Sequence, residues 1–341
     1  MPANLTPEYK KAEAAFKNAR DSRERLDCLR EMLRTIPKHK GTERLQADIK
    51  TRIKQLTDEL ATTKKGGGRR GPSYAVRPEG AAQIALIGAP NVGKSALHAQ
   101  LTGSHAEIGP YPFTTATPLP GMLPFEDIHF QLIDLPPVSR DHPVPWIVNT
   151  LQPADGCMLV VDLEDAECLE QVQTVIEVLR EKRVTLLPSR EPSAEAGDGP
   201  EDEAAADPFA VRLPTLLVAT KADESADPEG ELEAFQELMD TQFPALAVSA
   251  ETGKGSDQIA LWWFETFSVV RVYTKVPGHA AEMDHPFTLR RGDTVHDVAR
   301  LVHGDLASGL KYARLWGGQL QGQQVGRDHA VADGDVLELH V

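Results

Sequence analysis

Short apolar runs that end in polar residues dominate the middle of the chain. Residues 84–87, 157–161, 216–219 and 245–248 are almost wholly apolar, and residues 128–133 are apolar except at two positions. A run of this kind, bounded by turn residues, is typical of a buried β-strand. We therefore expect several buried strands, each followed directly by the polar residues that carry chemistry.

The amino-terminal residues follow a different spacing, with apolar side chains three or four positions apart. Thr6-Pro7-Glu8 favours a helix start, because it supplies a hydroxyl cap, a first-turn proline and an acid near the positive end of the helix dipole. Pro37 and Gly41 interrupt the spacing, and Thr42 can cap a further helix. The pattern predicts a basic helical hairpin over residues 1–65 and a Gly/Arg-rich linker over 66–81.

The carboxyl-terminal residues 268–341 contain both patterns typical of strands and patterns typical of helices. Residues 269–274 alternate as a strand, and we expect a short hairpin that turns through Arg291-Gly292-Asp293. A capped helix follows, with Val295 and Val298 on its inner face. Two further strands near the carboxyl terminus complete the pattern of a ubiquitin-like half-barrel.

Charge is unevenly distributed along the chain. The net charge of the 341 residues is -15, yet residues 1–75 hold 18 Lys/Arg against 10 Asp/Glu, which leaves -23 for the remainder. A basic arm on an acidic body favours contact with a polyanion through the arm, although a solvated helical face gives the same composition. Residues 188–210 are rich in Glu, Asp, Ala, Pro and Gly and predict an acidic flexible insert.

Cysteine usage and hydropathy narrow the class of protein. Cys28, Cys157 and Cys168 have no paired spacing, so neither a disulfide framework nor a zinc site is indicated. No apolar stretch approaches the length of a membrane span, and the amino terminus lacks the apolar core of a signal peptide. We therefore expect a cytoplasmic protein without a membrane partner.

Residues 83–95 place a glycine-rich turn between a predicted strand and a predicted helix. The turn has the pattern G-x-x-x-x-G-K-S, in which backbone N–H groups and a helix N-terminus surround phosphate. We expect Lys94 to reach the β- and γ-phosphates and the Ser95 hydroxyl to bind Mg²⁺. The residues expected to bind the phosphates are Gly88, Ala89, Pro90, Asn91, Val92, Gly93, Lys94, Ser95 and Ala96.

Further motifs follow in order along the chain. A polar, proline-bounded loop over 111–118 offers a threonine that can close over the γ-phosphate and bind the metal. Asp134 ends the next strand, where it can hold Mg²⁺ through water. Asp223 can accept both the N1–H and the N2–H₂ of guanine, which adenine does not offer, so an ATPase is disfavoured. The residues expected at the base are Thr220, Lys221, Asp223, Ser249, Ala250 and Glu251.

Together, N-V-G-K-S, Y-P-F-T-T, T-K-A-D and S-A-E resemble the translation-factor-related GTPases, and among them the Obg and DRG (developmentally regulated GTP-binding) families. The segments R-V-Y-T-K-V-P-G, K-Y-A-R-L-W-G and V-G-R-D-H resemble the TGS domain of DRG proteins. The resemblance implies an α/β P-loop GTPase domain over 82–267, with a mostly parallel sheet, and a β-grasp TGS domain over 268–341. It also implies that Thr115 is the switch threonine, acting with Lys94 and Asp134, and that Asn91 helps to place a potassium ion.

The chain departs from the family pattern directly after the metal aspartate. Relatives have D-x-x-G there, whereas Asp134 is followed by Leu135-Pro136-Pro137, and Pro137 has no N–H to donate to the γ-phosphate. A hydrogen bond to a charged group is worth about 1.5–3 kcal/mol, so the preference for GTP over GDP is expected to fall roughly 10- to 100-fold. Val138 stands where a glutamine would orient water. We expect tight guanine-nucleotide binding and slow hydrolysis.

Two classes of function follow from these observations. The first is a slow GTPase that uses Mg²⁺ and K⁺ and engages the ribosome or structured RNA through its basic arm and TGS domain, with a regulatory protein as a further partner. The alternative is a scaffold that binds GDP or GTP without appreciable hydrolysis. Basic residues expected to face RNA, if they cluster in space, are Arg271, Lys275, Arg290, Arg291, Lys311, Arg314 and Arg327.

Overall fold

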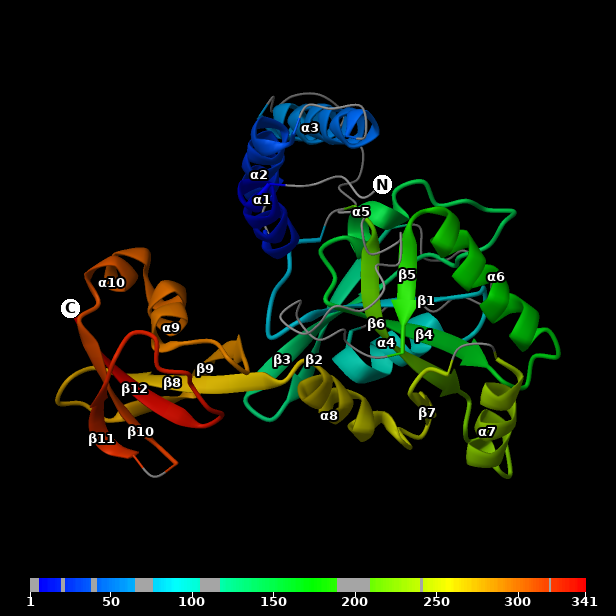
Figure 1. Ribbon diagram of the computed structural model, residues 1–341. Helices are drawn as coiled ribbons and strands as arrows, with labels where there is room; N and C mark the ends of the chain where they lie inside the picture. The colour runs from blue at the N-terminus through cyan, green and yellow to red at the C-terminus, as the bar shows by residue number, and fades with distance from the viewer. Residues whose placement is uncertain are drawn as a thin grey trace. The chain divides into compact units, whose positions relative to one another are not determined.

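The chain divides into two compact units (Figure 1), a helical unit formed by Met1–Arg77 with Gly197–Ala210 and a main unit formed by Pro78–Ala196 with Val211–Val341. The computed structural model describes residues 6–19, 22–37, 42–64, 76–104, 117–188, 209–239, 242–318 and 320–341. Most of the expected linker at 66–81 and of the expected acidic insert at 188–210 lies outside these described residues.

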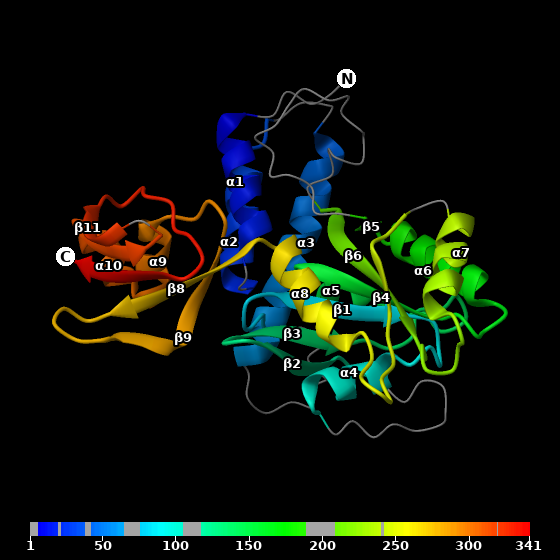
Figure 2. The ribbon, with the colours of Figure 1, turned by 90° about the horizontal axis from the view of Figure 1, so that it is seen from below.

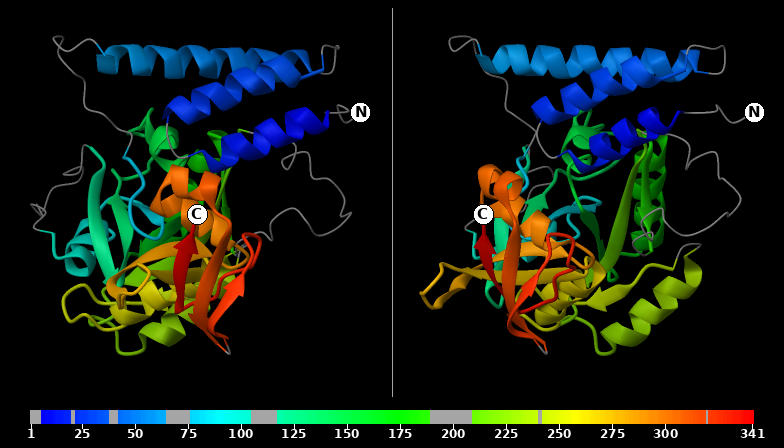
Figure 3. Two further views of the ribbon diagram at one scale, coloured as in Figure 1. Left: turned by 90° about the vertical axis from the view of Figure 1, so that its left-hand side faces the viewer. Right: turned by 60° about the vertical axis from the view of Figure 1, so that its left-hand side comes forward.

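Three helices form the helical unit, and the second lies between the other two (Figure 3). The Thr6 hydroxyl accepts a hydrogen bond from the Tyr9 N–H at 3.2 Å and caps the first of them. Their apolar stripes face one another, so Tyr9, Leu29 and Ile49 are fully buried. The helices are α1 (Pro7–Asn18), α2 (Ser22–Thr35) and α3 (Glu43–Lys64).

Phe209, which lies within the segment 188–210 expected to be a flexible acidic insert, is instead buried in the core of the helical unit. Its side chain is 2% exposed. Its ring meets the ring of Phe16 edge to face at 5.9 Å, and the Arg52 guanidinium lies 4.3 Å from the ring centroid. The packing of these helices therefore includes a residue that is remote from them in sequence.

A mostly parallel sheet lies at the centre of the main unit, in the strand order β2-β3-β1-β4-β6-β5, with β7 also paired to β6. β2 and β3 are antiparallel to each other, and the remaining pairs are parallel. Because β1, β3, β4 and β6 run in one direction, the residues that follow them meet at one edge. The strands are β1 (Gln83–Gly88), β2 (Leu119–Phe125), β3 (Ile128–Asp134), β4 (Gly156–Asp162), β5 (Val184–Leu187), β6 (Val211–Thr220) and β7 (Ala245–Ala247).

Helices cover both faces of this sheet (Figures 1 and 2). On one face, α4 and α8 share an apolar cluster with β1, β3, β4 and β6, in which Leu97 and Trp263 are fully buried. α6 packs on the other face, so the expected α/β fold is confirmed. No helix in the described parts of the chain is both long enough and apolar enough to cross a bilayer. The helices are α4 (Lys94–Thr102), α5 (Ile147–Leu151), α6 (Cys168–Glu181), α7 (Pro228–Leu238) and α8 (Ser256–Thr266).

The carboxyl-terminal part of the main unit is a five-stranded sheet in the order β11-β10-β12-β8-β9, with α9 and α10 packed on one face. The β8–β9 hairpin turns at residues 276–280, not at Arg291-Gly292-Asp293 as the sequence suggested. The latter residues lead into α9 instead, because the β8–β9 ladder extends as far as Lys275↔Ala281. The elements are β8 (Val269–Lys275), β9 (Ala281–Arg290), α9 (Val295–Val302), α10 (Gly304–Gly309), β10 (Tyr312–Gly317), β11 (Leu320–Val325) and β12 (Asp335–His340).

Gly156, at the start of β4, is a position where the core of the main unit has no room for a side chain. A Cβ atom there would lie 2.5 Å from Trp263 Cζ3 and 2.9 Å from Phe267 Cζ, whose rings are stacked at 5.0 Å. We predict that Gly156→Ala lowers the free energy of unfolding by about 1–3 kcal/mol through overpacking. Urea unfolding followed by tryptophan fluorescence measures it, and Gly326→Ala, with open space at its Cβ, is the control. Equal stability of the two variants would contradict the packing argument.

Candidate functional site

The loop between β1 and α4 turns within five residues at the carboxyl edge of the sheet. Gly88 has no room for a side chain, because a Cβ atom there would lie 2.4 Å from the Val160 carbonyl oxygen. Asn91 and Gly93 have φ angles of 64° and 82°, in the left-handed region, and Gly93 is the N-cap of α4. The turn thus aims the N-terminus of α4 and the backbone of the loop toward one point, an arrangement suited to an anion.

Lys94 is the first residue of α4 and is buried inside this loop. Its Nζ donates to the carbonyl oxygens of Gly88 at 3.2 Å and Ala89 at 2.6 Å. Burial lowers the pKa of Lys94 to about 8, and the nearby charge of Asp134 opposes the shift only in part. A phosphate bound in the loop would favour the charged ammonium, so phosphate and Lys94 suit each other.

Ser95 and Asp134 come together beside this lysine. The Ser95 hydroxyl donates to Asp134 Oδ2 at 2.5 Å, and Asp134 is fully buried at the end of β3, opposite Leu86 of β1. A hydroxyl and a carboxylate at the mouth of a phosphate loop are oxygen ligands of the kind that Mg²⁺ prefers. Among the described residues no group of three or more His, Cys, Asp or Glu side chains has the arrangement of a metal site. The Ser95 hydroxyl and the Asp134 carboxylate fit a Mg²⁺ ion that would share its coordination with phosphate and water.

Thr220 connects the phosphate loop to the strand that leads to the expected base-binding residues. Its hydroxyl lies 2.8 Å from the Val92 carbonyl oxygen and 3.2 Å from the Val161 carbonyl oxygen, and the residue is 5% exposed. The contact joins residues that are 128 positions apart in sequence. The structure therefore brings the loop that holds Lys94 and the turn that holds Asp223 to the same edge of the sheet.

The two expected base loops are joined to each other. The Ala222 N–H donates to the Val248 carbonyl at 3.0 Å, and the Val248 N–H donates to the Ala219 carbonyl at 2.8 Å. Ser249 is buried and its hydroxyl accepts from the Thr252 N–H at 3.0 Å, which closes a tight turn. Asp223 is exposed beside this turn, free of burial and open to a ligand.

Asp162, the last residue of β4, is a site residue that the sequence reading missed. Its Oδ2 lies 2.6 Å from Lys221 Nζ, and its Oδ1 accepts from the Glu164 N–H at 3.1 Å. The hydrogen bond to Asp162 raises the pKa of Lys221, which therefore stays charged. Asp162 is opposite Thr220 in the β4–β6 register, so the lysine next along the chain is within its reach. A polar residue that ends an apolar strand is the signal that could have identified it.

The segment after Asp134 is buried and bonded to β1. The Leu135 N–H donates to the Leu86 carbonyl at 3.3 Å, and the Val138 N–H donates to the Gly88 carbonyl at 3.0 Å. Pro136 and Pro137 are buried between these two bonds. The first N–H after the prolines is thus directed toward the phosphate loop and not toward solvent.

The structure brings together most of the residues expected from sequence. The phosphate loop, Lys94, Ser95 and Asp134 meet at one point, and the base loops reach the same edge through Thr220. Asn91 is exposed on the outer side of the phosphate loop, and Glu251 is exposed in the turn after β7. Thr115 lies outside the described residues.

Comparison with known families agrees with this geometry. A family model described as "50S ribosome-binding GTPase" matches residues 83–189, and a model described as "TGS domain" matches residues 270–341. The chain contains a GTPase domain and a TGS domain and is similar to the DRG proteins. The resemblance to DRG proteins expected from the motifs is therefore confirmed. The GTPase fold also supports the expected binding of guanine nucleotide.

Relatives of this DRG-like protein extend over most of its length. It is 27% identical to a GTP-binding protein of Methanocaldococcus jannaschii, over 93% of this chain and 92% of the relative. It is 26% identical to developmentally-regulated G-protein 2 of Arabidopsis thaliana, over 91% of this chain and 88% of the relative. A crystal structure of a GTP-binding protein from Pyrococcus horikoshii OT3 has a TM-score of 0.47 and 16% identity, over 76% of this chain and 99% of that one.

The Asp162–Lys221 pair gives a test of the base end of the site. We predict that Asp162→Asn weakens GDP binding by roughly fivefold, the equivalent of about 1 kcal/mol for a half-exposed ion pair. Asp165→Asn is the matched control. Asp165 is a carboxylate in the same turn and accepts from the Glu167 N–H, but the ion pair to Lys221 is made by Asp162. Calorimetric titration with GDP measures both variants. Equal affinities would show that Asp162 does not position the lysine.

Proposed function

We propose that this protein is a Mg²⁺-dependent GTPase of low intrinsic rate that acts in the cytoplasm on the ribosome or on structured RNA. The observation that carries the proposal is the Ser95 hydroxyl at 2.5 Å from Asp134, beside the buried Lys94 and the N-terminus of α4. Membership in a GTPase family favours hydrolysis over a scaffold that only binds nucleotide.

Each residue at the phosphate end has a role in positioning or charge. Lys94 neutralises phosphate charge, and Ser95 and Asp134 would hold Mg²⁺. When bound, the metal would neutralise further phosphate charge. Thr115 is proposed as the second direct ligand. Asp223 selects guanine, because its carboxylate accepts two donors that adenine lacks.

The slow rate is proposed from the segment that follows Asp134. Pro137 offers no N–H, and the next N–H, that of Val138, donates to Gly88 at 3.0 Å. The Val138 side chain is apolar and 4% exposed, so it cannot orient an attacking water. A potassium ion beside Asn91 would add positive charge at the phosphates without help from this segment.

Contact with RNA or the ribosome is proposed through the basic helices and the TGS domain. Three of the seven basic residues expected to face RNA form ion pairs, namely Arg271, Arg290 and Lys275, and Arg327 lies 3.2 Å from His296 Nδ1. Four others are exposed: Arg291, Lys311, Arg314 and Arg327. The description of the matching GTPase model names the 50S ribosome, which favours the same class of partner. A regulatory protein is a further proposed partner.

The assignment of guanine specificity to Asp223 can be tested by exchanging the nucleotide. We predict that Asp223→Asn lowers GTP affinity by roughly 10- to 100-fold, because about 1.5–3 kcal/mol of charged hydrogen bonding is lost. Xanthosine triphosphate should bind this variant better than GTP does, because xanthine has a carbonyl oxygen in place of the guanine 2-amino group and can accept from the asparagine amide. Titration with both nucleotides measures the effect, and Glu224→Gln serves as the neighbouring exposed control. Unchanged GTP affinity would remove Asp223 from the site.

Hydrolysis is tested by multiple-turnover phosphate release from the full chain. We expect slow release with Mg²⁺ and K⁺, a lower rate when Na⁺ replaces K⁺, and loss of release in Lys94→Ala, which lacks the phosphate-binding ammonium. Addition of ribosomes is expected to raise the rate. If the unmodified protein releases phosphate no faster than Lys94→Ala in any condition, the proposed hydrolysis is wrong and the protein only binds nucleotide.

A further inference from the structure

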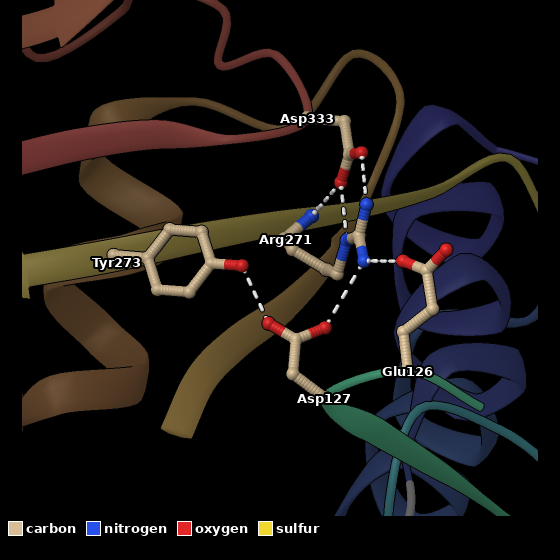
Figure 4. Close-up of polar contacts among 5 residues, drawn as sticks. All are labelled: Glu126, Asp127, Arg271, Tyr273 and Asp333. Carbon is tan, nitrogen blue, oxygen red and sulfur yellow. Dashed lines mark hydrogen bonds and ion pairs between the residues drawn. The ribbon is translucent and has the colours of Figure 1, made fainter. Parts of the chain in front are cut away.

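Arg271 of β8 lies at the centre of a polar cluster that joins the TGS domain to the nucleotide domain (Figure 4). Its guanidinium donates to Asp333 Oδ1 at 3.0 Å and Oδ2 at 2.7 Å, to Asp127 Oδ1 at 3.0 Å, and to Glu126. The Tyr273 hydroxyl donates to the other oxygen of Asp127. We call these five residues the Arg271 clamp. Arg271 lies in β8 of the TGS sheet and Asp333 in the turn before β12, whereas Glu126 and Asp127 form the turn between β2 and β3.

The guanidinium at the centre of the Arg271 clamp is largely shielded from solvent and fully paired, whereas the Glu126 side chain at its edge is 59% exposed. The Arg271 side chain is 17% exposed, and its guanidinium lies 5.2 Å from the ring centroid of Phe264 in α8. The hydrogen bonds from Arg271 hold the pKa of Asp333 below its usual range, and the bond to Asp127 raises the pKa of Tyr273 to about 12. Bidentate arginine–carboxylate geometry fixes direction as well as distance. The clamp is therefore a rigid joint.

The turn held by the clamp is the far end of the hairpin that carries the metal aspartate. β2 and β3 are paired without interruption from Phe125↔Ile128 at the turn to Leu119↔Asp134 at the nucleotide site. Leu119 also follows directly on the loop proposed to carry the switch threonine. A displacement at the nucleotide end of such a ladder moves its turn as well, because paired strands do not slide independently.

We propose that the β2–β3 hairpin transmits the nucleotide state to the TGS domain through the Arg271 clamp. The inference rests on the proposed function, in which a triphosphate engages the loop before β2 and a diphosphate does not. The two nucleotides then favour different positions of the hairpin, and the clamp passes the difference to β8 and to the Asp333 turn. By linkage, a partner that holds the TGS domain in one position changes the relative affinity for the two nucleotides by the same factor.

Arg290 makes a second contact between the TGS domain and the nucleotide domain. Arg290 of β9 donates to the Ala81 carbonyl at 3.0 Å, and its guanidinium lies 4.8 Å from the ring centroid of Phe267. Ala81 precedes β1, whose fully buried residues lie in the middle of the sheet. The Arg290 contact therefore attaches the TGS domain to the segment before β1, at a point separate from the clamp.

The test uses hydrogen exchange in the full chain with Mg²⁺ and either GDP or a non-hydrolysable GTP analogue. The reporter is the peptide containing Gly334, whose N–H donates to the Arg271 carbonyl at 2.9 Å. In the unmodified protein we expect exchange there to differ by about fivefold or more between the two nucleotides, the lower end of the usual range of coupling between sites. Arg271→Ala and the milder Asp127→Asn should remove the difference. Arg314→Ala, an exposed arginine on β10 of the same sheet, should retain it.

The binding of both nucleotides is measured first with fluorescent analogues, so that two failures can be told apart. If neither nucleotide binds, the proposed function is wrong and the inference fails with it. If both bind and exchange at Gly334 is equal in the unmodified protein, the coupling alone is overturned. A nucleotide-dependent difference that persists in Arg271→Ala and Asp127→Asn would show that the clamp is not its route.

Discussion

The hydroxyl of Thr220 is the contact on which the candidate site depends. It lies within hydrogen-bonding distance of the Val92 and Val161 carbonyls, so it ties the phosphate loop, the end of β4 and the start of the base loop into one body. Leaving a buried carbonyl without a hydrogen-bond donor costs about 1–3 kcal/mol. Moving either the Val92 or the Val161 segment away from Thr220 is therefore unfavourable. A nucleotide bound as proposed would need this connection, because its phosphates and its base would contact loops that follow different strands.

β3 connects that site to the rest of the main unit. Its last residue is Asp134, and its first follows the turn that Arg271 holds. Across the sheet, the buried Gln83 amide donates to Gln131 at 2.7 Å and fixes β3 against β1. A buried pair of amides gives direction to an otherwise apolar interface, which a purely hydrophobic contact would not do. The strand that ends at Asp134 is thus held at its turn and across the sheet.

The sequence predicted the central strands and their chemistry because parallel strands buried on both faces read as apolar runs ending at one edge. It did not predict β2, where Pro120 and Pro124 conceal the strand. Prolines are tolerated there because β2 is an edge strand paired to β3 alone. β11 was missed because it is also an edge strand, at the edge of the five-stranded TGS sheet, and its exposed glutamines hide the alternation of a strand. Asp162 was missed because its partner, Lys221, is near only after β4 and β6 pair.

The alternation of side chains along β8 indicated that Arg271, Tyr273 and Lys275 share one face of the strand. It did not indicate which residues that face contacts. In a single domain such a basic, aromatic face would be exposed and open to RNA, which is how the sequence alone suggested reading Arg271. Around Arg271, however, three carboxylates converge, two of them from the nucleotide domain. Three acids at one guanidinium exclude a phosphate backbone by like charge. Arg271 therefore belongs to the joint between domains, and any RNA surface must lie on other residues of the TGS sheet.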